Sequence, residues 1–213
     1  AGEIRTDPDT FAICTDTIIR HVGDIGRMVD EFSSFARMPV PVLRDEDMTE
    51  LVRRAAFLQR TANPEIRFDL DLSSSPVRLL CDGRQVSQAL VNVLKNAAEA
   101  IQARSAGAAP GHIRIRMTDA DGGVTVAVED NGIGLPHQER DRLTEPYVTT
   151  RAGGTGLGLA IVKKIMEDHG GELRLEDCDG GGARVTLLFV RGDARVAEAG
   201  ETERVKREGT HGA

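Results

Sequence analysis

Two asparagines lie four positions apart in the segment Asn92-Val-Leu-Lys95-Asn96. At this spacing both side chains share one face of a helix, where an amide oxygen can coordinate a hard cation such as Mg²⁺ directly or through water. Lys95 is placed to reach a phosphate group. Taken alone, such a pair is more often an ordinary polar face and such a lysine is more often solvated. The pair therefore gains meaning only from the motifs that follow it.

A carboxylate followed by glycines comes next, in Asp130-Asn-Gly132-Ile-Gly134. A strand is predicted just before it, so the carboxylate stands at the strand end and can accept an N–H group from a ligand. The glycines allow a ligand ring to approach the backbone. As a bare pattern, the segment is equally compatible with a plain Asn-Gly turn.

A second glycine stretch precedes a predicted helix. Free backbone N–H groups at the start of a helix, at the positive end of its dipole, suit a polyphosphate. A flexible linker is the alternative, but Leu157, Ile161 and Ile165 continue at helical spacing and argue against it. The residues of this predicted phosphate cradle are Gly154, Thr155, Gly156, Leu157 and Gly158.

The segment between the two glycine stretches is rich in Gly, Pro, Thr and charged residues and predicts a long loop. Loops of such length usually serve function. Its candidates for contact with a ligand are an aromatic residue and the polar residues that follow it: Tyr147, Thr149, Thr150 and Arg151.

A long amphipathic helix is predicted ahead of these motifs. Apolar residues recur from Phe11 to Ala36 mainly in steps of three and four, which forms a heptad seam, and Pro39 and Pro41 end the helix. Further apolar positions widen the seam, so we expect a bundle helix with several neighbours.

Shorter elements must carry the motifs. Helices are predicted from Asp47 to about Arg60, from Asp82 to Ile101 and from about Thr155 to His169, the first two starting at capping boxes. Alternating apolar residues predict strands near 66–72, 77–80, 113–117, 124–128, 173–175 and 185–189. These elements predict an α+β fold, a two-layer sandwich of a mixed sheet with three helices on one face. We expect His169 to be a cation that interacts favourably with the C-terminal end of its helix.

Composition excludes several functions. The 213 residues include 27 Lys and Arg against 34 Asp and Glu, a net charge of −7 that argues against nucleic-acid binding. Only 3% of residues are aromatic, which argues against a base-stacking platform. Cys14, Cys81 and Cys178 lack metal-ligand spacing and predict reduced thiols. No apolar run approaches the ~20 residues that cross a bilayer, so no membrane contact is expected.

In their order, these motifs resemble the GHKL or Bergerat ATP-binding fold, and within it the catalytic domain of two-component sensor histidine kinases. The similarity is to five boxes of that family: its N box at Asn92–Ala100, first glycine box at Asp130–Gly134, phenylalanine box at Thr144–Arg151, second glycine box at Gly154–Gly158 and weak last glycine box at Gly180–Gly182. Tyr147 stands where most relatives have Phe. Ala100 replaces an aromatic residue that many relatives stack near adenine.

The resemblance implies Mg-ATP as the ligand. It implies that Asp130 binds the adenine amino group, that Asn96 holds Mg²⁺ and that Asn92 lies beside the phosphates. It also implies that the amides of 154–158 cradle the phosphates and that residues 135–153 form the ATP lid.

The segment 20–39 looks like the second hairpin helix of nitrogen-regulation kinases of the NtrY type. The first hairpin helix of that family carries His-Glu-x-x-Asn-Pro, with the histidine that receives the phosphoryl group, and this motif is absent from the sequence. His21 has neither the acidic neighbour nor the Asn-Pro. The resemblance thus implies a protein histidine kinase that transfers the γ-phosphoryl group to a histidine outside this sequence, for onward transfer to a response regulator, and that cannot phosphorylate itself.

Domain boundaries follow from this resemblance. Residues 1–41 are expected as the second helix of the dimerisation and phosphotransfer hairpin, 42–191 as the catalytic ATP-binding domain and 192–213 as a disordered tail. The full-length protein is expected to form a homodimer through the bundle helix. The catalytic region would be cytoplasmic, with the parent anchored in the bacterial inner membrane.

Two other functions remain open. A GHKL ATPase or serine kinase needs a carboxylate one turn before the Mg²⁺ asparagine, to activate water or a hydroxyl. That position is Asn92, which cannot act as a base, so transfer to a neutral imidazole fits better. A nucleotide-sensing module without transfer activity would bind ATP and leave no phosphoryl label.

Overall fold

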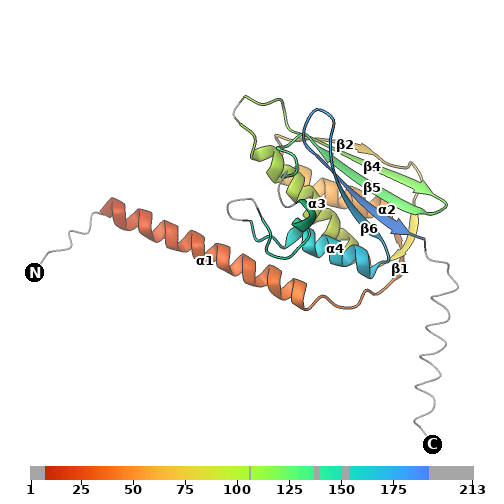
Figure 1. The fold of residues 1–213 in the computed structure, drawn as a ribbon, viewed down its shortest axis with the longest axis horizontal. Helices are drawn as coiled ribbons and strands as arrows, with labels where there is room; N and C mark the ends of the chain where they lie inside the picture. The colour runs from red at the N-terminus through yellow and green to blue at the C-terminus, as the bar shows by residue number, and fades with distance from the viewer. Residues whose placement is uncertain (1–7, 106, 137–139, 150–153, 192–213) are drawn as a thin grey trace, which may run out of the picture. The chain divides into compact units, whose positions relative to one another are not determined.

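The computed structural model describes residues 8–105, 107–136, 140–149 and 154–191 (Figure 1). The chain divides into two compact units, one of residues 1–40 and 136–161 and the other of residues 41–135 and 162–213. Among the described residues, no helix combines the length and hydropathy that a membrane crossing requires.

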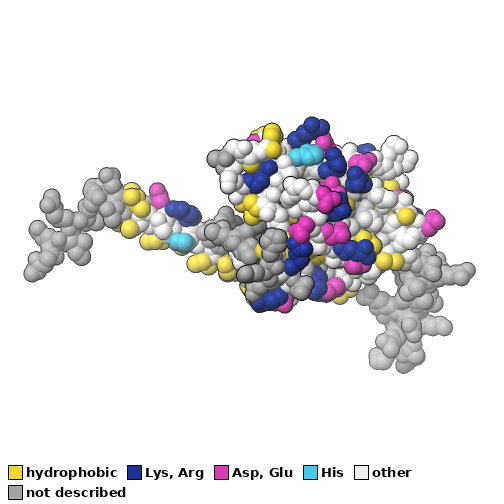
Figure 2. Space-filling view, turned by 45° about the horizontal axis from the view of Figure 1, so that its top comes forward, with side chains coloured by type: hydrophobic (Ala, Val, Ile, Leu, Met, Phe, Trp, Pro, Cys, Tyr) yellow, Lys and Arg dark blue, Asp and Glu magenta, His cyan; other side chains and the backbone are white. Residues whose placement is uncertain are grey.

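The long helix α1 spans Pro8–Ala36 in the first unit, where the heptad pattern predicts it. Its apolar side chains are exposed, and Figure 2 shows them along the helix. The exposed members of this stripe are Phe11, Ile18, Ile19, Val22, Ile25, Met28, Val29 and Phe32. An amphipathic helix buries such a stripe against partner helices, so this is the surface on which bundle neighbours would pack.

In the part of the chain that the structure describes, the second unit is built on a mixed sheet of five strands. Their order across the sheet is β2-β4-β5-β7-β6. Its strands are β2 (Arg67–Asp71), β4 (His112–Ala120), β5 (Gly123–Asp130), β6 (Glu172–Asp177) and β7 (Ala183–Val190). The pair β2–β4 is parallel and the other pairs are antiparallel. Ile113 pairs with Asp130, so Asp130 ends β5 beside the start of β4.

Helices α2 (Met48–Ala62) and α3 (Gly83–Gln102), with residues 162–168 of α4 (Gly158–Asp168), cover one face of this sheet (Figure 1). The core consists of alternate strand residues and the apolar faces of these helices, such as Ile113, Ile115, Val126, Leu187, Val86, Leu90, Val93, Leu94 and Ile165. The predicted α+β sandwich with a mixed sheet is therefore confirmed.

Aspartates begin the first two helices of this layer, as predicted. Oδ1 of Asp47 accepts from the N–H groups of Thr49 and Glu50 at 3.0 and 3.4 Å. Oδ1 of Asp82 accepts from those of Arg84 and Gln85 at 3.0 and 3.2 Å. Each bond satisfies a helix N–H group that has no partner within the helix.

The third helix, α4, begins at Gly158, later than the predicted start near Thr155. The hydroxyl of Thr155 accepts from the N–H of Leu157 at 3.4 Å, so these residues form a turn before the helix.

A small antiparallel pair, β1 (Arg44–Asp47) with β3 (Arg78–Cys81), departs from the sequence expectation. The segment Arg44–Asp47 is charged and has no apolar alternation, so no strand is predicted there. Its partner β3 buries Leu79 and Cys81, and pairing with that strand determines its conformation.

His169 also differs from its prediction. The backbone N–H of Asp82 donates to Nε2 of His169 at 3.0 Å, and Nδ1 lies 2.7 Å from the carbonyl of Ile165. A backbone N–H can only donate, so Nε2 carries no proton and Nδ1–H donates to Ile165. The imidazole is therefore neutral in this fold, not the cation expected from helix-end electrostatics.

Candidate nucleotide-binding site

The asparagine pair lies on α3, whose opposite face is buried in the core. Asn92 and Asn96 are half-buried on the same side of the helix. Nδ2 of Asn92 is buried and, among the described residues, has no hydrogen-bond partner. Lys95 is 54% exposed, with Nζ 3.9 Å from a carboxylate oxygen of Glu99. A buried amide nitrogen without a partner is costly unless a water molecule or a ligand accepts its hydrogen bond.

Asp130 is 7% exposed at the end of β5. Its Oδ1 accepts from the N–H of Gly132 at 2.8 Å, which closes a turn. The N–H of Ile133 then donates to the carbonyl of Ala100 at 3.1 Å. A Cβ on Gly132 would lie 2.6 Å from the carbonyl carbon of Ala100, so only glycine fits there.

Ala100 connects the carboxylate turn to the asparagines. It lies four residues after Asn96 and eight after Asn92, so all three share one side of α3. Ala100 is 4% exposed and packs on Gly132. The fold thus brings the amides of α3 and the Asp130 turn to one end of the same helix face. Both contacting residues, Gly132 and Ala100, are small, and apart from this small size nothing in the sequence predicts that they pack together.

The last glycine turn lies against the same strand end. Gly182 has φ of +90°, and a Cβ there would come within 1.9 Å of the carbonyl oxygen of Asp130. Gly134, with φ of +78°, approaches the Gly182 carbonyl, since its Cβ would lie 3.4 Å from that oxygen. Burial raises the pKa of the Cys178 thiol in this turn, and Glu129 adds to the increase. The weak motif Gly180–Gly182 therefore packs under the strong one.

In the first unit, the aromatic residue and the second glycine stretch pair through their backbones. The N–H of Tyr147 donates to the carbonyl of Gly156 at 3.1 Å. Gly156 has φ of +69°, and its Cβ would lie 2.7 Å from the carbonyl carbon of Tyr147. Tyr147 itself has φ of +68°, a left-handed conformation that bulky residues rarely adopt. Its ring lies near that of Phe32 on α1, with centroids 6.3 Å apart.

The remaining predicted residues are placed as follows. Leu157 is buried, while Gly154, Thr155 and Gly158 are half-buried next to the start of α4. Thr149 is exposed. Thr150 and Arg151 lie outside the described residues.

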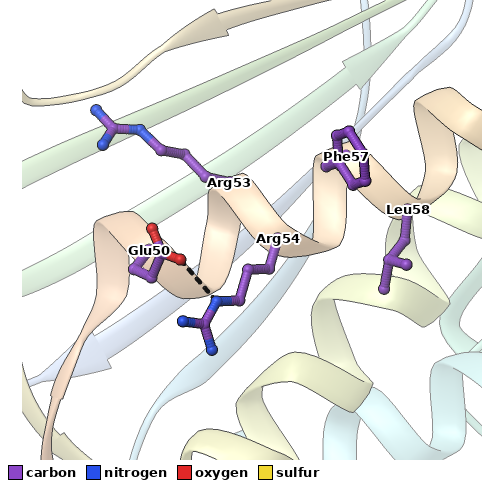
Figure 3. Close-up of a pocket in the computed structure, with 5 residues that line it drawn as sticks. All are labelled: Glu50, Arg53, Arg54, Phe57 and Leu58. Carbon is purple, nitrogen blue, oxygen red and sulfur yellow. Dashed lines mark hydrogen bonds and ion pairs between the residues drawn. The ribbon is translucent and has the colours of Figure 1, made fainter.

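A hollow of about 400 Å³ lies elsewhere, on the outward side of α2 (Figure 3). It is lined by Glu50, Arg53, Arg54, Phe57 and Leu58. An ion pair of 2.6 Å joins Glu50 to Arg54 along the helix. These residues come from one helix face and include none of the motif residues, so the hollow is separate from the candidate site.

The comparisons first define the class of protein. Residues 81–193 match the family described as histidine kinase-, DNA gyrase B-, and HSP90-like ATPase. The mycobacterial sensor histidine kinase MprB has a solved structure that is 30% identical, with a TM-score of 0.61, covering 70% of this chain and 97% of that chain. The chain therefore belongs to the family of histidine kinase-, DNA gyrase B- and HSP90-like ATPases.

A particular relative is the nitrogen regulation protein NtrY of Azorhizobium caulinodans. It is 54% identical over 197 residues, which cover 92% of this chain and 25% of the relative. The chain thus spans about a quarter of the length of that relative. Full-length ShkA, solved in complex with AMPPNP, is 29% identical with a TM-score of 0.66, covering 84% of this chain and 39% of that chain.

Proposed function

We propose that the chain is the ATP-binding catalytic region of a two-component sensor histidine kinase. It would transfer the γ-phosphoryl group of ATP to a histidine on a helix that its sequence does not contain, for onward transfer to a response regulator. Membership of the ATPase family, the similarity to NtrY and the AMPPNP complex of ShkA support this proposal.

The observation that carries the proposal is the buried, unpartnered Nδ2 of Asn92. A phosphate oxygen or a metal-bound water beside α3 would accept its hydrogen bond and remove the cost of burial. One turn further on, Asn96 presents an amide with an oxygen suited to Mg²⁺. The amide nitrogen of Asn92 and the amide oxygen of Asn96 therefore suit the phosphates and the ion of a magnesium nucleotide.

Magnesium would be held by Asn96 together with phosphate oxygens and water. Among the described residues, no group of three or more His, Cys, Asp or Glu side chains could hold a metal ion. Mg²⁺ usually binds through few protein ligands and substrate phosphates, which agrees with this set. When bound, the ion would neutralise charge on the phosphates.

The other roles follow from the chemistry of each group. The Asp130 carboxylate would accept the adenine amino group, and Gly132 and Gly134 would let the ring approach the backbone. The glycine stretch before α4 would donate N–H groups to the phosphates. We also assign contacts with the nucleotide to Lys95, Tyr147, Thr149, Thr150, Arg151, Gly154, Thr155, Gly156, Leu157 and Gly158.

The acceptor chemistry follows from Asn92. An amide cannot remove a proton from water or a hydroxyl, whereas the neutral imidazole of a histidine has a lone pair ready for attack. The site would therefore bind and orient ATP while a histidine supplies the nucleophile.

We further propose that α1 is the second helix of a dimerisation and phosphotransfer hairpin, with residues 42–191 as the catalytic domain. The exposed stripe on α1 supports this division, since it needs partner helices. A homodimer of the full-length protein would supply them.

Calorimetric titration of ATP with Mg²⁺ tests the site. Replacing Asp130 by Asn removes a charge-assisted hydrogen bond worth about 1.5–3 kcal/mol, so affinity should fall roughly ten- to hundredfold. Asp71→Asn is the control, because Asp71 is 70% exposed in a surface pair with Arg116. Unchanged affinity in Asp130→Asn would remove Asp130 from the site.

Labelled ATP tests the reaction. The chain should not label itself but should phosphorylate an added hairpin that carries His-Glu-x-x-Asn-Pro. Acid-labile label on His21 would contradict an external acceptor. Steady phosphate release into water, abolished by Asn92→Ala, would instead identify an ATPase. ATP binding with no label on the hairpin would identify a nucleotide-sensing module.

A further inference from the structure

The turn that carries Asp130 is fastened by a residue outside the assigned site, Asn131. Its Oδ1 accepts from the N–H of His112 at 2.8 Å, and its Nδ2 donates to the carbonyl of Pro110 at 2.9 Å. Its own N–H donates to the carbonyl of His112 at 3.2 Å. The side chain of Asn131 is thus occupied by the backbone that leads into β4.

Arg104 fastens the same turn from the other side. Nη1 of Arg104 donates to the carbonyl of Asn131 at 3.0 Å, and Nε donates to the carbonyl of Ile101 at 3.2 Å. Arg104 follows the last turn of α3, where a cation also meets the negative end of the helix dipole. One half-buried guanidinium therefore joins the end of α3 to the turn after β5.

This arrangement matters because α3 and β5 carry different parts of the candidate site. Asn92 and Asn96 belong to α3, and Asp130 ends β5. The Arg104 bridge, together with the bond from Ile133 to Ala100, determines how the carboxylate stands relative to the amides. A guanidinium with two bonds in a fixed plane is well suited to such positioning.

We propose that Arg104 and Asn131 are positioning residues that hold the Asp130 carboxylate rigidly enough to distinguish adenine from guanine. This inference rests on the proposed function, in which Asp130 accepts the adenine amino group. Guanine presents a carbonyl oxygen at the equivalent ring position, and a carboxylate fixed opposite it is repelled. A loosened turn lets the carboxylate move away, so ATP binds more weakly and GTP is rejected less.

The test is titration of ATP, GTP and inorganic tripolyphosphate with the wild-type chain and with Arg104→Gln, Arg104→Lys and Asn131→Ala. We expect Arg104→Gln to weaken ATP about tenfold and to reduce the ATP-to-GTP affinity ratio by a similar factor, the size of one charge-assisted bond. Tripolyphosphate affinity should stay unchanged, since it has no base. Arg104→Lys, which keeps a charged donor, should restore part of the ratio. Asn131→Ala should reduce the ratio at least as much as Arg104→Gln.

Arg116→Gln is the matched control, because Arg116 is a β4 arginine whose surface pair with Asp71, at 3.1 Å, lies outside the turn. An unchanged ratio in Arg104→Gln, beside a collapsed ratio in Asp130→Asn, would overturn the positioning role and leave the adenine site intact. An unchanged ratio in Asp130→Asn would overturn the adenine site itself. Equal losses for ATP and tripolyphosphate in Arg104→Gln would show general damage to the fold and also contradict the positioning role.

Discussion

The backbone N–H of Asp82 donates to Nε2 of His169, 3.0 Å away, and so ties the start of α3 to the residue after α4. The two residues are 87 positions apart in sequence. Through this bond, two helices that cover the same sheet share one neutral imidazole.

Removing this imidazole should destabilise the second unit. In His169→Ala the N–H of Asp82, a residue that is 2% exposed, loses its acceptor while it stays buried, which costs about 1–3 kcal/mol. His21→Ala is the control, since His21 is exposed on α1. The chain has no Trp, so urea unfolding is best followed by circular dichroism. Equal midpoints for the two variants would contradict a structural role for His169.

Asp82 should also make the fold sensitive to acid. Burial acts to raise the pKa of its carboxyl, but hydrogen bonds from the N–H groups of Val42, Gln85 and Arg84 together lower the pKa below 3.8. A lowered folded-state pKa means that the stabilisation is complete above the unfolded value and is lost as the pH falls through the folded value.

We therefore expect Asp82→Ala to lose about 1–2 kcal/mol of unfolding free energy at neutral pH. As the pH falls below about 4, the difference from the wild type should shrink, because the carboxyl of the unfolded chain takes up its proton first and the folded one follows only below its lowered pKa. Urea unfolding at several pH values measures this. A difference that grows toward low pH would have the wrong sign.

Two glycines in one turn allow the effect of backbone strain to be distinguished from the effect of a close contact. Gly180 and Gly182 both have φ of +90°, but a Cβ on Gly182 would lie 1.9 Å from the Asp130 carbonyl oxygen, whereas one on Gly180 meets no described atom within 4 Å. Gly182→Ala should therefore displace the end of β5 and weaken ATP binding. Gly180→Ala should only lose about 1–2 kcal/mol of stability to the left-handed backbone. Calorimetry that finds equal ATP affinities would disprove the contact.

A similar comparison applies to the predicted lid. Gly156 and Gly170 have φ of +69° and +64°, but only the Cβ of Gly156 would press on Tyr147, while Gly170 has open space among the described atoms. Gly156→Ala should break the bond from the Tyr147 N–H and speed hydrogen exchange at that amide. Gly170→Ala should leave that exchange rate unchanged. Slow Tyr147 exchange in Gly156→Ala would show that the pairing does not depend on close approach.

Much of the fold could be predicted from local pattern. The heptad seam predicts α1, alternation predicts the β4–β5 hairpin, and the aspartates at 47 and 82 predict helix starts that the structure confirms. These features depend on residues a few positions apart, so periodicity and capping chemistry are sufficient. The family could likewise be predicted from short segments. The asparagine motif and the three glycine motifs each have their own spacing and follow one another in a fixed order.

Only the tertiary structure decided the rest. The strand β1 has no apolar alternation and forms because β3 lies beside it. Three further contacts join segments far apart in the chain. They are the hydrogen bond from Asp82 to His169, the contact of Gly132 with Ala100 and the bridge from Arg104 to Asn131. No local spacing encodes them, because their energy comes from burial and hydrogen bonds that exist only once helices and sheet have packed.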